Sequence, residues 1–142
     1  MMNTFDTVKQ SIIDDNEQMF GAEVRERYGD HAADASNAHI QGMTQEQFNE
    51  GERLRVALEG KLRAAVAAGD PSCAAAQEAC DLHRQWLRVF YPSYTKQYHV
   101  SLGEMYADDE RFKAHYEKIA LGCAEFLRDA INIFCETYSH ST

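Results

Sequence analysis

Residues 44–72 read TQEQFNEGERLRVALEGKLRAAVAAGDPS, and this stretch predicts a long helix with both of its ends marked. Thr44, with Gln47 three residues later, has the pattern of a capping box, which satisfies the first backbone N–H groups of a helix. Apolar side chains then recur mostly at intervals of three and four residues: Phe48, Leu54, Leu58, Leu62, Ala65 and Val66. Gly69, followed by Asp70-Pro71, supplies the stop.

The segments after this helix keep the helical period to the end of the chain. A second helix is expected over residues 72–91, because Pro92 cannot continue it. Its inward stripe is Ala75, Ala79, Leu82, His83, Trp86, Leu87 and Phe90. Further helices are expected over residues 93–107, from the acidic run 108–110 onward, and after Gly122. No run alternates apolar and polar residues as a paired strand would, so we predict one all-α domain spanning residues 1–142.

The first 40 residues are predicted to be the least stable part of this domain. They carry an acidic run near residues 14–17 and a polar, alanine-rich stretch over residues 30–40, with few large apolar side chains. Helices that bury little surface are marginal in water. We therefore expect residues 1–40 to form a flexible helical lid and residues 44–138 to form the helical core.

Composition and charge exclude several classes of function. Asp and Glu number 23 against 14 Lys and Arg, so the net charge of −9 repels nucleic acid and anionic lipid. No apolar stretch approaches the roughly 20 residues that span a bilayer, and the N-terminus has no signal-peptide pattern. The four cysteines lack a Cys-x-x-Cys pair and are expected to be free thiols. These features favour a cytoplasmic protein that binds neither nucleic acid directly nor a membrane.

The sequence lacks the common motifs that indicate a catalytic site. It contains no Gly-rich phosphate loop, no Gly-x-Ser-x-Gly elbow, no His-Glu-x-x-His and no Glu-x-x-His pair. Asp81 and His83, two residues apart on a helix, point to opposite sides and are not expected to share a metal ion. The acidic run 108–110 is best explained as a helix start. We expect no enzyme activity, no metal and no cofactor.

The most informative feature is the density of aromatic residues between His83 and Tyr106. Six rings fall in these 24 residues: Trp86, Phe90, Tyr91, Tyr94, Tyr98 and Tyr106. Each buried Tyr hydroxyl needs a hydrogen-bond partner, whereas a cleft for a large, partly polar ligand requires flat faces with polar edges. Aromatic stripes at helical spacing are also common in cores, and a histidine on an apolar stripe is often a hydrogen-bonded core residue. The pattern leaves both interpretations open.

Several segments, in order and spacing, are similar to one known family. They are Glu23-Val24-Arg25-Glu26-Arg27-Tyr28-Gly29, His83-Arg84-Gln85, Leu102-Gly103-Glu104-Met105-Tyr106, Asp109-Glu110-Arg111-Phe112 and Leu127-Arg128-Asp129-Ala130-Ile131. Together they resemble the TipAS antibiotic-recognition domain over about residues 20–133. The resemblance implies a globin-like domain whose cleft binds large, rigid, apolar antibiotics such as thiopeptides, with a mobile N-terminal part that folds over the ligand.

In that family the domain commonly forms the C-terminal half of MerR-type regulators, and it also occurs alone as a drug-sequestering protein. Because the chain begins with Met1-Met2 and no helix-turn-helix precedes the domain, the stand-alone form is expected. In the founding type a cysteine near the turn between the central helices attaches to the drug. Tyr94 and Ser101 stand where such thiols would be expected, so the resemblance favours non-covalent capture here.

The predicted ligand-binding residues are His83, Trp86, Phe90, Tyr94, Tyr98 and Tyr106, and the predicted partner is a small-molecule antibiotic. The alternative is a haem or small-ligand sensor that uses the globin-like architecture, with His83 or His99 as the axial ligand. An enzyme that modifies the antibiotic ranks last, because no activated nucleophile or acid–base pair is found. The oligomeric state stays open.

Overall fold

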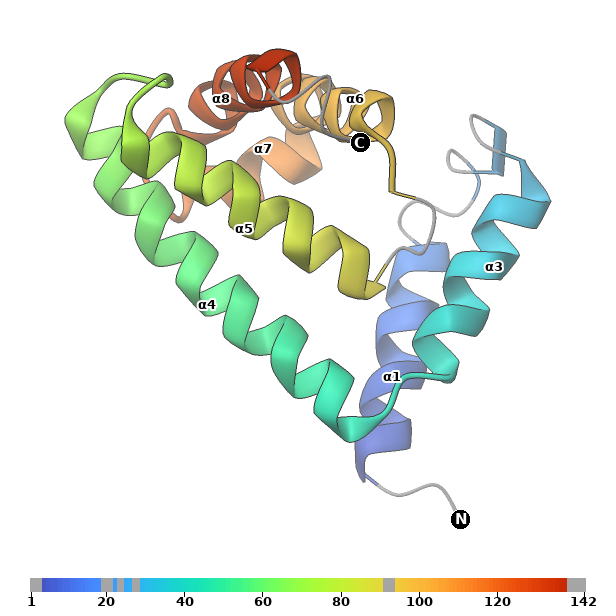
Figure 1. Cartoon of the computed structure of the whole chain (residues 1–142). Helices are drawn as coiled ribbons and strands as arrows, with labels where there is room; N and C mark the ends of the chain where they lie inside the picture. Colours follow the sequence, from blue (N-terminus) through green and yellow to red (C-terminus); the bar gives the residue numbers. More distant parts are fainter. Residues whose placement is uncertain (1–3, 19–21, 23–24, 27–28, 91–93, 138–142) are drawn as a thin grey trace. The chain divides into compact units, whose positions relative to one another are not determined.

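The computed structural model describes residues 4–18, 22, 25–26, 29–90 and 94–137, and these residues form helices and no strand (Figure 1). In chain order the helices are α1 (Thr4–Asn16), α3 (Asp30–Gln41), α4 (Gln45–Ala68), α5 (Ala74–Phe90), α6 (Lys96–Asp108), α7 (Glu110–Glu117) and α8 (Cys123–Thr137). The predicted all-α class is confirmed.

The chain forms two compact units. The first comprises residues 1–51 with 89–92, and the second comprises residues 52–88 with 93–142. The division therefore falls inside α4 and close to the end of α5.

Lys9 joins α1 to the end of α3 in the first unit. Its side chain is buried, with 7% of the residue exposed. The ammonium donates hydrogen bonds to the carbonyls of Gln41 at 2.8 Å and Met43 at 3.1 Å, and it lies 4.5 Å from the centre of the Phe5 ring. These carbonyls lie at the C-terminal end of a helix, where a cation is favourable. Apart from Lys9, only Ile13 of α1 is buried, as expected for a helix that buries little surface.

Arg25 forms ion pairs with three acidic side chains near α1 and α3 in the same unit. Its guanidinium lies 2.6 Å from Glu17, 2.9 Å from Asp34 and 3.2 Å from Asp30. Asn37 also donates to Glu17, at 2.8 Å. The arrangement connects residue 17 to the middle of α3 through charges that lie near the surface.

The helix ends follow the sequence signals. The backbone N–H of Gln47 donates to Thr44 Oγ1 at 3.1 Å, and that of Thr44 donates to Gln47 Oε1 at 3.0 Å, which confirms the capping box. Gly69 ends α4 with a φ of 79°, a left-handed conformation that favours glycine. Asp109 caps α7, since its carboxylate accepts from the Arg111 N–H at 2.9 Å. The acidic run there is a helix start, as predicted.

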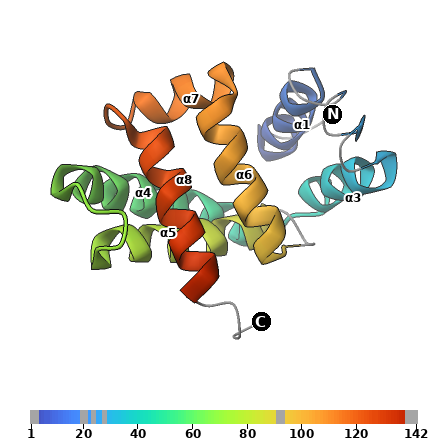
Figure 2. The same ribbon diagram turned by 90° about the horizontal axis from the view of Figure 1, so that it is seen from above.

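In the second unit α6 and α8 run antiparallel and pack closely, joined through α7 (Figure 2). Gly103 lies at the contact. A Cβ atom on this residue would come within 3.3 Å of Ile131 Cδ1 and 3.4 Å of Arg128 Cα. The glycine costs α6 some helix propensity, but it allows the two backbones to approach.

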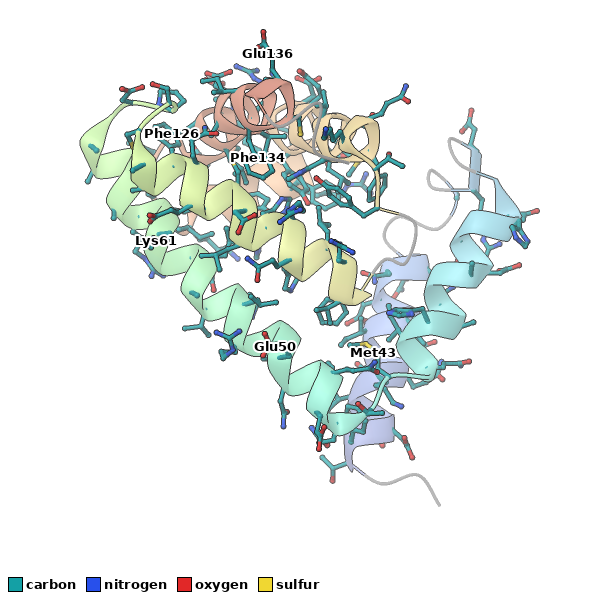
Figure 3. The ribbon with its side chains drawn as sticks, viewed as in Figure 1. Met43, Glu50, Lys61, Phe126, Phe134 and Glu136 are labelled. Atoms are coloured by element: carbon teal, nitrogen blue, oxygen red, sulfur yellow. The ribbon has the colours of Figure 1, made fainter. Side chains whose placement is uncertain are left out.

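The core face of α8 is built from apolar side chains at helical spacing. Cys123, Leu127, Ala130 and Ile131 are fully buried, and Phe134 is nearly so. Phe126 is only half-buried, and Tyr138 lies outside the described residues. Figure 3 shows Phe134 pointing from α8 toward α5, whereas Glu136 points away from the helices.

Candidate functional site

Four polar rings in the second unit form one continuous hydrogen-bonded chain. His83 Nδ1 lies 2.8 Å from His99 Nε2, and the other ring nitrogens lie 3.3 Å and 2.7 Å from the hydroxyls of Tyr106 and Tyr94. The order is Tyr94, His99, His83, Tyr106, and we call this set the His–Tyr chain. Both histidines are 0% exposed and Tyr106 is 5% exposed, whereas Tyr94 is half-buried.

Helix periodicity places the members of the His–Tyr chain where they can meet. His99 and Tyr106 are seven residues apart on α6, so they lie two turns apart on the same face. The buried residues of α6 are His99, Leu102, Gly103, Tyr106 and Ala107, which all belong to that face. His83 comes from the inward stripe of α5, and Tyr94 from the residues just before the Thr95 cap of α6.

Apolar and aromatic side chains surround this polar chain. The Trp86 ring is stacked on His83, with centroids 6.0 Å apart and an angle of 13° between the planes. Phe134 meets His99 edge to face at 5.9 Å, and Phe112 and Tyr116 lie 5.4 Å and 4.6 Å from Tyr106. The two histidines are therefore shielded from bulk solvent, and they satisfy their hydrogen bonds with one another and with the tyrosines.

Burial keeps both histidines neutral. Burial, and secondarily the neighbouring His99, holds the pKa of His83 well below its usual value. Burial also lowers the pKa of His99 to about 4, helped by the positive charge of Arg84. At the other end of the chain, burial raises the pKa of Tyr94 to about 12, although Arg84 and Arg88 oppose the rise.

Three of the six predicted site residues, His83, Tyr94 and Tyr106, belong to the His–Tyr chain, and Trp86 is stacked on it. Tyr98 is half-buried on α6, where its backbone N–H donates to Thr95. Phe90 belongs to the first unit, where its ring meets Phe48 edge to face at 6.3 Å. The structure thus does not bring Phe90 into the same compact unit as the others, and its role as a ligand contact stays a prediction.

His99 is the important residue that the predicted set omitted. It appeared in the sequence analysis only as an alternative haem ligand, yet it is the centre of the His–Tyr chain. Its spacing of seven residues from Tyr106 was the available signal. For a haem, both nitrogens of each histidine are already hydrogen-bonded, so an iron atom would have to displace one of these bonds.

Elsewhere the described residues offer weaker candidates. No group of three or more His, Cys, Asp or Glu among them is arranged to hold a metal ion. A shallow hollow of about 190 Å³ in the first unit is lined by Asp6, Lys9, Gln10 and Gln41. Its lining residues are polar or charged, and it is smaller than the roughly 300–1,000 Å³ of typical ligand sites. None of the described helices is long and apolar enough to cross a membrane.

Comparison with known proteins identifies the family of the chain. The model of the TipAS antibiotic-recognition domain matches residues 20–134, which include the whole His–Tyr chain. The chain belongs to the TipAS family. No solved structure matches it.

The TipAS domain also aligns with parts of longer regulators. It is 32% identical over 111 residues to the HTH-type transcriptional activator TipA of Streptomyces coelicolor, and to the same degree to TipA of Streptomyces lividans. These alignments cover 77% of this chain and 44% of each relative. The HTH-type transcriptional activator mta of Bacillus subtilis is 27% identical over 124 residues, which are 87% of this chain and 48% of mta. The chain thus spans less than half the length of these relatives.

Proposed function

We propose that this chain binds large, apolar, aromatic antibiotics of the thiopeptide kind through the aromatic residues around the His–Tyr chain. The observation that carries the proposal is the family match over residues 20–134, because this span contains the four polar rings and Trp86. The bound antibiotic would serve either drug sequestration or ligand sensing, since both begin with the same binding step.

Exposure to solvent divides five of the six predicted contacts into two groups, and Phe90 is considered separately because it belongs to the first unit. Trp86, Tyr94 and Tyr98 are half-buried, so we assign direct contact with the ligand to these three residues. Flat aromatic faces of this kind stack on thiazole or aryl rings and tolerate varied partners. His83 and Tyr106 are buried, so we propose that they hold the three half-buried residues in place and do not touch the ligand themselves.

Three of the four thiols of the chain favour non-covalent capture. Burial raises the pKa of Cys123 to about 12 and also raises the pKa values of Cys80 and Cys135. A protonated thiol is a poor nucleophile, so these cysteines are ill suited to attack an unsaturated group of the drug. Tyr94, at a position where the family resemblance suggests a thiol, carries a hydroxyl instead.

A titration with three compounds tests the proposal. A purified thiopeptide, an unrelated apolar drug and haemin are each added while the fluorescence of Trp86, the single tryptophan, and the thermal unfolding are followed. We expect a saturable signal and a higher Tm with the thiopeptide, because a ligand that prefers the native state stabilises it. Binding of haemin with a Soret band, without binding of the thiopeptide, would overturn the proposal in favour of a haem sensor.

A further inference from the structure

The His–Tyr chain has one hydrogen more than its internal bonds use. Each of its four groups carries one hydrogen on nitrogen or oxygen when the histidines are neutral. The three internal bonds consume three of them. The fourth hydrogen must lie at one end of the chain, on Tyr94 or on Tyr106.

The position of this hydrogen determines the tautomers of both histidines. In the inward direction, Tyr94 donates to His99 Nδ1, His99 Nε2–H donates to His83 Nδ1, and His83 Nε2–H donates to Tyr106. In the outward direction every bond is reversed, and the Tyr94 hydrogen points out of the chain. Conversion from inward to outward needs one proton to enter at the Tyr94 hydroxyl, each shared hydrogen to pass to its acceptor, and the original Tyr106 hydrogen to leave, so the chain carries four hydrogens before and after. Because the two rings share a single bond between His83 Nδ1 and His99 Nε2, both carry their hydrogen on Nε2 inward and on Nδ1 outward.

The distances favour the inward direction in the empty protein. The Tyr94–His99 bond of 2.7 Å is as short as bonds donated by hydroxyls, whereas N–H donors lie nearer 2.9–3.0 Å. The bond at the Tyr106 end is the weakest of the three, at 3.3 Å. Tyr94 is therefore held as a donor toward the interior until another acceptor competes for its hydrogen.

The surroundings of Tyr94 suit such an acceptor. Tyr94 is the half-buried end of the chain, whereas Tyr106 is buried and out of reach of a ligand. Arg84 and Arg88 place positive charge near the Tyr94 hydroxyl, and of these Arg84 is paired with Asp81. Two residues after Tyr94, the buried ammonium of Lys96 has no hydrogen-bond partner among the described residues. Positive charge at this end attracts carbonyl or carboxylate oxygens.

We propose that Tyr94 is the polar specificity contact of the site, which donates its hydrogen to a carbonyl or carboxylate oxygen of the ligand and thereby reverses the His–Tyr chain to the outward direction. This inference rests on the proposed antibiotic binding and adds a chemical requirement to it. Aromatic area alone is not enough, and the ligand must place an acceptor oxygen at Tyr94. The amide carbonyls of a thiopeptide meet this requirement.

The tautomers provide the direct test. Long-range ¹H–¹⁵N NMR spectra at pH 7 distinguish Nδ1–H from Nε2–H on each histidine. We expect both to be Nε2–H in the empty protein and both to be Nδ1–H with a purified thiopeptide bound. Unequal tautomers, or tautomers that do not change on binding, would overturn the inference.

Affinity measurements with matched variants add a second readout. Tyr94→Phe removes only the donor, and we expect thiopeptide binding about 3- to 10-fold weaker, the effect of one neutral hydrogen bond. Ser72→Ala, which removes a hydroxyl that bonds Asp70 and belongs neither to the His–Tyr chain nor to the aromatic residues around it, should stay within about twofold of the wild type. Equal affinities of Tyr94→Phe and the wild type would contradict the assigned role.

A third variant separates this inference from the proposed function. Tyr106→Phe leaves His83 Nε2 without its partner, and an unpaired acceptor is tolerated better than an unpaired N–H. We therefore expect both histidines of empty Tyr106→Phe to become Nδ1–H. If the wild-type protein does not bind the thiopeptide, the proposed antibiotic binding is wrong. The spectrum of empty Tyr106→Phe then still tests whether the His–Tyr chain can reverse, because tautomers equal to those of the wild type would show that it cannot.

Discussion

Two neutral histidines in a core make stability depend on pH. The folded-state pKa of His99 is about 4 and that of His83 is well below normal, whereas an unfolded histidine titrates near 6.5. Below pH 6.5 the two histidines therefore bind protons in the unfolded chain but stay neutral in the folded chain. The free energy of unfolding must fall as the pH drops from 6.5 toward 4, by at most about 1.4 kcal/mol per pH unit for each histidine.

Urea denaturation at pH 7, 6 and 5 tests this dependence. We expect His99→Gln to remove about half of the slope of unfolding free energy against pH, because only one of the two buried histidines is left to bind a proton on unfolding. His115→Gln alters an exposed histidine of α7 and should leave the slope unchanged. A wild-type protein that is equally stable at pH 7 and pH 5 would show that the two imidazoles are not kept neutral.

Trp86 is the residue whose loss should weaken binding most. Its large, half-buried ring combines apolar area with a flat face, which is typical of binding hot spots. We expect Trp86→Ala to weaken thiopeptide binding more than about tenfold, or about 1.4 kcal/mol, in calorimetry. Trp86→Phe keeps a flat ring and should lose less. Unchanged affinity of a folded Trp86→Ala protein would reject the assignment.

At the scale of the helices, Lys9 links α1 to α3 through its ammonium. Lys9→Met keeps the length of the side chain but leaves the carbonyls of Gln41 and Met43 without this donor. We expect a loss of about 1–3 kcal/mol of stability in the first unit, seen as faster hydrogen exchange of the α3 amides. Lys61→Met removes an exposed cation paired with Glu78 and should cost less than about 1 kcal/mol. Equal exchange rates in the two variants would contradict the linking role.

The contact between α6 and α8 depends on Gly103. Gly103→Leu would force a side chain between Ile131 and the backbone at Arg128, and we expect a loss of about 1–3 kcal/mol by urea denaturation. Gly60→Leu makes the same replacement on α4, where a Cβ atom meets nothing within 4 Å. That control should keep or raise stability, because leucine is a better helix former than glycine. Similar losses in both variants would attribute the effect to something other than the close approach.

For the whole molecule, the sequence predicted the elements better than their partners. Helix ends were readable because local chemistry sets them: Thr44 and Gln47 form the expected capping box, and Asp109 caps α7. The packing of α6 on α8 could not be predicted, since a glycine inside a helical segment indicates by itself only a lower helix propensity. The advantage of a glycine at position 103 comes from the close approach of Ile131 and Arg128, which are distant from it in sequence.

The same limit applies to the site. Periodicity placed His83 on an inward face, and the structure confirms that it is buried. It could not show that His83 meets His99, because that pairing depends on how α5 and α6 pack. The stripe of α5 likewise grouped Phe90 with Trp86, although Phe90 packs with Phe48 in the other unit.

The His–Tyr chain also has a calorimetric consequence. Reversing its bonds takes one proton in at Tyr94, passes each shared hydrogen to its acceptor and releases one proton from Tyr106, so the net number of protons on the chain does not change. Its reversal therefore adds no contribution from buffer ionisation to the heat of thiopeptide binding. We expect the same binding enthalpy at pH 7.5 in phosphate and in Tris, two buffers with very different heats of ionisation. A difference between the two enthalpies would mean that binding of the drug is coupled to a net uptake or release of protons.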